Sequence, residues 1–257
     1  MINKLSLYLV QNNPLWKDIS TNLDAYTKLL SSVEEQSVIV FPEMFSSGFI
    51  AKPKEIEKDI ELTKRWMRSF SADTNVTVMG SMPYFSNEKY VNRLYVFENG
   101  LEIGVYDKRH LFSLSNEHED FNAGKERIVT NVSGWRMLLS ICYDLRFPVW
   151  LRNNEDYDVL VNVVNWPRSR AAIWRKLLMA RAIENQCYVI GVNRVGEDGN
   201  GYKYIGESCV VNPDGTILAE AGQQEELLKV ELDYEKLIAF KEKFPFYRDR
   251  DQFEIIW

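Results

Sequence analysis

Three ionisable side chains stand directly after short runs that are typical of strands: Glu43, Lys108 and Cys142. Because open α/β sheets bind their ligands at the carboxyl ends of strands, a fold presents such positions to a substrate. Taken singly, each residue also has an ordinary structural interpretation, as a hydrogen-bonded carboxylate, a solvated ammonium or a small buried thiol.

Together the three residues form a chemically complete set. A thiol needs a base to become the nucleophilic thiolate, and a nearby ammonium lowers the pKa of the thiol. The same ammonium can stabilise the oxyanion that forms when the thiolate attacks a carbonyl carbon. The set therefore predicts a hydrolase with Cys142 as nucleophile, Glu43 as base and Lys108 as cation, without a catalytic histidine.

Other chemistries have less support in the sequence. His110 and His118 are the two histidines, so a Cys-His hydrolase would have to use one of them. No His/Cys cluster has the ligand spacing of a zinc site, and Cys187 and Cys209 lie in apolar runs, so we expect no metal. The glycine-rich segment 196–201 does not open a helix after a strand, which favours a loop over a nucleotide site.

The composition limits the class of protein. The 257 residues are 46% apolar and 26% charged, which suits an ordinary globular core. A net charge of -6 argues against nucleic acid and anionic membranes as partners. No stretch approaches the roughly 20 apolar residues of a membrane helix. The apolar run 5–10 is too short for a signal peptide, and three scattered cysteines fit a reducing compartment, so we expect a cytoplasmic protein.

Strand-like and helix-like segments alternate along the chain. The spacing of apolar residues predicts helices near 19–33, 56–70 and 170–185. Short apolar runs predict strands at 5–10, 37–41, 76–79, 137–141, 159–164, 187–192, 208–212, 216–219 and 227–232. Residues 90–98 and 101–106 flank Asn99-Gly100 and predict an antiparallel hairpin.

This alternation predicts an α/β fold in which two mixed sheets face each other with helices outside. Residues 109–127 are polar and irregular, and we expect a functional loop there. The chain shows no repeat and no linker, so we expect one domain over residues 1–257.

Three local motifs resemble those of the nitrilase superfamily of carbon-nitrogen hydrolases. They occur in the order found in the family and are Phe41–Phe49 (FPEMFSSGF), Tyr106–Phe112 (YDKRHLF) and Ile141–Pro148 (ICYDLRFP). Segments 165–167, 180–185 and 193–196 extend the resemblance over nearly the whole chain. Segments 107–112, 142–150 and 242–245 are most similar to the bacterial omega-amidase branch.

The resemblance implies a four-layer α-β-β-α sandwich that pairs into a homodimer and uses no metal or organic cofactor. It also implies a fourth site residue, a glutamate in the loop after Lys108. Glu117 matches this position by its distance from Gly124, and Glu119 is the neighbour that competes for the assignment. The apolar ending 244–257 fits docking on a partner subunit.

For an omega-amidase, the resemblance implies hydrolysis of short 2-oxo-acid amides, 2-oxoglutaramate or 2-oxosuccinamate, with water as the second substrate. The backbone N–H of Tyr143 would join Lys108 in stabilising the oxyanion. Phe49, Asn165 and Trp166 are candidates for the pocket wall, with core packing as the alternative for the two aromatic residues.

Such substrates carry a carboxylate, which a guanidinium binds in bidentate fashion. The candidates for this contact are Arg146, Arg109 and Arg168, and a structural ion pair is the alternative for Arg146. Two other functions remain open: another superfamily hydrolase acting on a nitrile, an N-carbamoyl amine or a different linear amide, and a catalytically silent binding or scaffold protein with the same fold.

Overall fold

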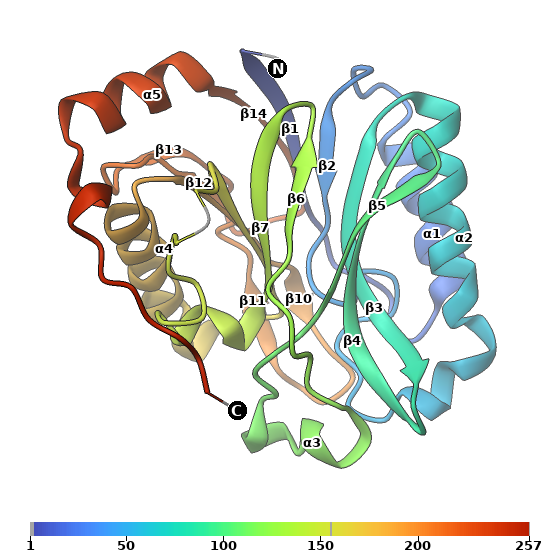
Figure 1. Cartoon of the computed structure of the whole chain (residues 1–257). Helices are drawn as coiled ribbons and strands as arrows, with labels where there is room; N and C mark the ends of the chain where they lie inside the picture. Colours follow the sequence, from blue (N-terminus) through green and yellow to red (C-terminus); the bar gives the residue numbers. More distant parts are fainter. Residues whose placement is uncertain (1–2, 155, 257) are drawn as a thin grey trace.

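The computed structural model describes residues 3–154 and 156–256. Two six-stranded mixed sheets face each other at the centre of the molecule (Figure 1). The first has the order β14-β1-β2-β3-β4-β5, with strands β1 (Lys4–Gln11), β2 (Val38–Val40), β3 (Thr77–Ser86), β4 (Lys89–Glu98), β5 (Leu101–Asp107) and β14 (Glu226–Asp233). The second has the order β13-β12-β9-β8-β7-β6, with strands β6 (Val129–Val132), β7 (Trp135–Ile141), β8 (Val159–Val163), β9 (Tyr188–Val192), β12 (Cys209–Val211) and β13 (Ile217–Glu220).

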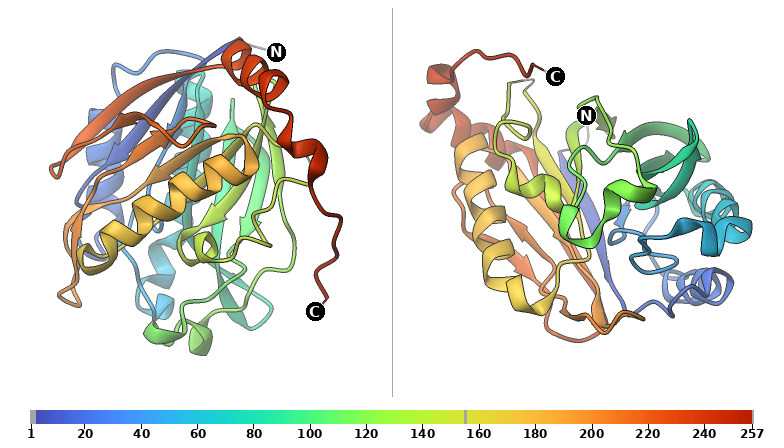
Figure 2. Two further views of the ribbon diagram at one scale, coloured as in Figure 1. Left: turned by 90° about the vertical axis from the view of Figure 1, so that its left-hand side faces the viewer. Right: turned by 90° about the horizontal axis from the view of Figure 1, so that it is seen from below.

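Helices cover the outer face of each sheet. α1 (Ile19–Leu29) and α2 (Glu57–Thr74) lie on the first sheet, and α4 (Ala171–Asn185) lies on the second, which gives the expected α-β-β-α sandwich (Figure 2). The remaining elements are short or peripheral: α3 (Glu117–Asp120), α5 (Tyr234–Lys243), the pair β10 (Val195–Glu197) and β11 (Lys203–Ile205), and the 3-10 turns η1 (Pro53–Ile56), η2 (Ser113–Ser115), η3 (Cys142–Arg146), η4 (Arg168–Arg170) and η5 (Phe246–Asp249). No helix in the described part of the chain is long and apolar enough to cross a membrane.

The continuous apolar runs of the strands follow from burial on both faces. In β1, Leu7 and Leu9 belong to the apolar cluster between the two sheets, whereas Tyr8 and Val10 belong to the cluster under α1 and α2. Successive strand residues point to opposite faces, so a strand between two apolar layers needs apolar residues at every position.

Turn chemistry accounts for one hairpin that the sequence predicts and one that it misses. Asn99 and Gly100 have φ angles of 50° and 77° and join β4 to β5, as predicted. The predicted strand 76–79 is too short, because β3 continues to Ser86 and forms a second hairpin with β4. Asn87 and Glu88 make that turn with φ of 51° and 70°, and glutamate is not a usual residue at positive φ.

Candidate active site

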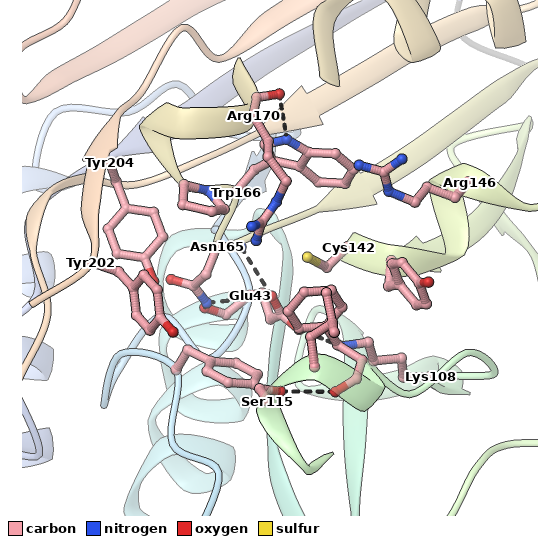
Figure 3. A pocket seen from close by; sticks show the side chains of 15 residues that line it. Glu43, Lys108, Ser115, Cys142, Arg146, Asn165, Trp166, Arg170, Tyr202 and Tyr204 are labelled. Carbon is pink, nitrogen blue, oxygen red and sulfur yellow. Dashed lines mark hydrogen bonds and ion pairs between the residues drawn. The ribbon is translucent and has the colours of Figure 1, made fainter. Parts of the chain in front are cut away.

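Glu43, Lys108 and Cys142 meet in one pocket, although they come from distant points in the chain (Figure 3). Glu43 follows β2 after two residues, Lys108 directly follows β5, and Cys142 directly follows β7. The structure therefore brings together the three residues that strand position and residue type single out.

Lys108 lies between two buried carboxylates. Its Nζ atom is 3.1 Å from Oε1 of Glu43 and 3.0 and 2.9 Å from the two oxygens of Glu117. None of the three side chains is more than 1% exposed. Buried charges need such pairing because an isolated ion loses the stabilisation that water provides.

Glu117 is the residue that contacts Lys108, and Glu119 is exposed. Glu117 opens α3 inside the segment that the sequence describes as an irregular loop. The backbone N–H of Phe112 donates to Oε2 of Glu117 at 2.7 Å, so the loop before the helix also orients the carboxylate. Glu117 is not among the residues that line the pocket, so it contacts the ammonium of Lys108 without forming part of the pocket wall.

Two asparagines hold the carboxylate of Glu43 in place. The backbone N–H of Asn165, after β8, donates to Oε2 at 2.9 Å, and Nδ2 of Asn92, on β4, donates to Oε1 at 2.8 Å. The carbonyl of Asn92 also accepts from the backbone N–H of Lys108 at 2.9 Å. Asn92 thus positions both Glu43 and Lys108. The sequence does not predict this role, because a single Asn within a strand-like run belongs to no recognisable motif.

Cys142 is held in a backbone conformation that few residues adopt. Its φ angle is 46°, at the change from β7 to the 3-10 turn η3. The first N–H groups of a helical turn have no acceptor within the turn. The N–H of Tyr143 is one of these, which makes it a suitable donor for an oxyanion next to Cys142.

Asp144 ties the turn that contains Cys142 to the segment that contains Lys108. Its carboxylate accepts from the backbone N–H groups of Ile141 at 3.0 Å and His110 at 2.8 Å, and from the Tyr106 hydroxyl at 2.7 Å. The Asp144 side chain is fully buried. These contacts fix the end of β7 against the end of β5. They therefore hold the thiol and the ammonium in a fixed position relative to each other.

The electrostatic environment favours a protonated thiol and a protonated amine. Burial, followed by the negative charge of Glu43, raises the pKa of Cys142 well above its ordinary value. Burial alone would lower the pKa of Lys108, but the charges of Glu117, Glu43 and Cys142 outweigh burial and raise it. Burial also raises the pKa of Glu117, against the opposing effect of Lys108.

The pocket has a volume of about 250 Å³, which suits a small molecule. Its wall includes five residues that the sequence nominates for contact with the substrate: Phe49, Tyr143, Arg146, Asn165 and Trp166. It also includes residues that the sequence does not nominate, among them Phe112, Arg170, Tyr202 and Tyr204. Arg170 ends the 3-10 turn η4 and Tyr204 lies on the strand β11, two short elements whose positions depend on tertiary contacts.

Two of the three arginine candidates are wrong, because they do not line this pocket. Arg109 donates to the carbonyl of Gly124 at 3.2 Å and lies 5.9 Å from the Trp150 ring. Arg168 is exposed at the start of η4. Among the residues that the structure describes, no group of three or more His, Cys, Asp or Glu side chains could hold a metal ion.

Comparison with known proteins identifies the family of this chain. Residues 8–242 match the family model of the carbon-nitrogen hydrolases. The chain is 43% identical to omega-amidase YafV of Yersinia enterocolitica, over 99% of this chain and all of that protein. It is 33% identical to 2-oxoglutaramate amidase of Bacillus subtilis, over 82% of this chain and 84% of that protein.

A solved structure agrees as well. XC1258 from Xanthomonas campestris, a CN-hydrolase superfamily protein with an arsenic adduct in its active site, has a TM-score of 0.91 against this chain and is 36% identical. The match covers 99% of this chain and all of that chain. The fold and the comparisons define an amide-hydrolysing enzyme of the nitrilase superfamily. The chain belongs to the carbon-nitrogen hydrolase family.

Proposed function

We propose that the enzyme hydrolyses the terminal amide of short 2-oxo-acid amides, 2-oxoglutaramate and 2-oxosuccinamate, to the 2-oxo dicarboxylic acid and ammonia through a thioester on Cys142. The observation that carries this proposal is the pairing of one Lys108 ammonium with Glu43, beside Cys142 in the same small pocket. The similarity to an omega-amidase and to a 2-oxoglutaramate amidase supports the choice of substrate.

In the first half of the reaction, the Glu43 carboxylate takes the proton of the Cys142 thiol while the sulfur attacks the amide carbon. Because the thiol pKa is raised, the thiol is protonated at neutral pH and its attack requires this base. The Lys108 ammonium and the backbone N–H of Tyr143 stabilise the oxyanion of the tetrahedral intermediate. Glu43 then returns the proton to the nitrogen, the C–N bond breaks, and ammonia leaves a thioester.

In the second half, Glu43 takes a proton from water, and the resulting hydroxide attacks the thioester carbon. The C–S bond breaks, the carboxylic acid leaves, and the proton on Glu43 restores the thiol. Glu117 keeps Lys108 in place throughout, through its two contacts with the ammonium.

A panel of substrates tests the proposal. The rate of ammonia release would be measured with 2-oxoglutaramate, a short nitrile, an N-carbamoyl amino acid and a neutral short amide. We expect the highest kcat/KM with 2-oxoglutaramate. A higher value with the nitrile or the carbamoyl compound would assign a different superfamily activity, and no turnover of any compound would favour the scaffold function.

We also propose that residues 1–257 work as one domain, because one apolar cluster includes strands of both sheets. A cytoplasmic homodimer is proposed on two further grounds. Cys142, Cys187 and Cys209 are all free thiols. The C-terminal segment also exposes apolar side chains, with Phe246 63% and Ile256 91% exposed.

A further inference from the structure

Two guanidinium groups line the pocket beside Cys142 (Figure 3). Arg146 is the last residue of η3, the turn that begins with Cys142, and Arg170 precedes α4. The guanidinium carbon of Arg146 lies 5.2 Å from the centroid of the Trp166 ring, and that of Arg170 lies 5.3 Å from the centroid of the Phe112 ring. The two side chains therefore reach the same cavity from two different elements, each against an aromatic ring.

Neither guanidinium forms an ion pair with a carboxylate among the described residues. Elsewhere in the chain, arginines do form such pairs: Arg175 lies 2.7 Å from Glu220, and Arg181 lies 3.0 Å from Glu184. A half-buried guanidinium that packs on a ring retains N–H groups that can bind an anion in bidentate fashion. This contrast indicates that the two pocket arginines are available to a ligand.

The charges of the catalytic residues explain why a substrate anion needs such arginines. With both carboxylates ionised, Glu43, Glu117 and Lys108 carry a net charge of about -1. An anionic substrate would be repelled by this charge in a pocket from which water is partly excluded. Arg146 and Arg170 add two positive charges, which makes the net charge around the pocket positive.

We propose that Arg146 and Arg170 form a clamp that binds the carboxylate of the substrate at the end opposite the amide. The clamp selects linear amides with a negative charge at the far end over neutral amides of the same length. This inference rests on the proposed function, because it assumes that the amide carbon lies at Cys142. It identifies Arg170 as a specificity-determining residue.

Two substrates of equal length test the clamp. Succinamate carries a carboxylate where butanamide carries a methyl group, and both offer the same amide to Cys142. In Arg170→Gln, we expect the ratio of kcat/KM for succinamate to kcat/KM for butanamide to fall roughly 10- to 100-fold, mainly through the KM for succinamate. Arg168→Gln is the matched control, because Arg168 is exposed and outside the pocket, and its ratio should equal that of the wild type.

A wild-type ratio in Arg170→Gln would overturn the clamp, whether neither kcat/KM changes or both fall by the same factor. Arg146→Gln should lower the ratio too, but Arg170 is the sharper test because Arg146 belongs to the turn that positions the nucleophile.

A binding measurement separates this inference from the proposed function. Calorimetric titration with succinate, which has no amide, should show weaker binding to Arg170→Gln than to Arg168→Gln. If the wild type hydrolyses no amide but binds succinate more tightly than Arg170→Gln does, the proposed function fails, while the carboxylate-binding site at Arg170 stands. Equal succinate affinity in the two variants would overturn the clamp whether or not the enzyme turns over.

Discussion

Glu43 has two opposite effects on the thiol of Cys142 in the proposed mechanism. Its negative charge disfavours the thiolate and contributes to the raised pKa of Cys142. In the proposed mechanism, Glu43 is also the base that removes the thiol proton during the attack. On that proposal, the cysteine is a neutral thiol at rest and becomes reactive when the proton is transferred.

These two effects of Glu43 can be separated experimentally. In Glu43→Gln, the negative charge beside the sulfur is lost, so the thiolate is less disfavoured and the pKa of Cys142 falls. The pH midpoint of iodoacetamide labelling at Cys142, followed by peptide mass spectrometry, should move to lower pH than in the wild type. Amide turnover should nevertheless fall by about 10²- to 10⁴-fold, because the base is absent.

Cys187 and Cys209 are buried, so Cys142 is the thiol that the reagent can reach. Glu119→Gln is the control, since this exposed acid of α3 does not contact the site, and it should keep the wild-type midpoint. A midpoint that stays the same or rises in Glu43→Gln would contradict the assigned environment of the thiol.

At the scale of elements, Asp144 links the end of β7 to the segment after β5. Asp144→Asn replaces one acceptor oxygen with a donor, so at least one of the buried N–H or O–H groups loses its partner. We expect the free energy of unfolding to fall by about 1–3 kcal/mol. We also expect a lower kcat, because the thiol and Lys108 are then held less firmly together.

Tyr157→Phe provides a matched control for general destabilisation. The buried hydroxyl of Tyr157 donates to the carbonyl of Leu151 at 2.6 Å, and neither residue lines the pocket. Thermal unfolding and kcat should be measured for both variants. If Asp144→Asn loses no more activity than Tyr157→Phe, then Asp144 has no positioning role.

The sequence predicts those parts of the fold and the site that depend on local patterns. Glu43, Lys108 and Cys142 could be found because each is a reactive type directly after a strand-like run. Glu117 could be found only through the family motif, since an acid in a polar segment is usually solvated. The sequence points to Arg168 and not to Arg170, because the direction of two side chains on one 3-10 turn depends on what packs around the turn.

Several features of the fold have no local signal in the sequence. The strands β6, β10 and β11 contain no continuous apolar run, whereas the short strands β2 and β12 do. β14 pairs with β1 from the opposite end of the chain, and no local signal specifies that pairing. The helix α5 lies between the predicted strand 227–232 and the apolar ending 244–257, where the sequence predicts no element.

At the scale of the whole molecule, the C-terminal segment runs along the outside of the α4 side of the sandwich (Figure 1). Hydrogen bonds to Gln186 hold its start, because the carbonyl of Phe244 accepts at 2.6 Å and the backbone N–H of Tyr247 donates at 3.0 Å. The segment is thus fixed to its own chain but leaves apolar side chains exposed, which favours a partner surface.

This surface gives a test of the proposed homodimer. Light scattering at micromolar concentration should give the mass of two chains, and Phe246→Asp should lower that mass because a carboxylate is costly to bury in an interface. Leu101→Asp is the control: Leu101 is 68% exposed but begins β5, in the other sheet. A wild-type monomer, or equal dissociation in both variants, would contradict the dimer interface.

In the proposed mechanism, the sulfur of Cys142 carries the acyl group during turnover. The direct measurement is acid quenching of enzyme mixed with 2-oxoglutaramate, followed by mass spectrometry of the peptide that contains Cys142. We expect one acyl group on that peptide in the wild type, and neither acyl group nor ammonia release with folded Cys142→Ala. Continued ammonia release by Cys142→Ala, or an acyl group on another residue, would contradict this account.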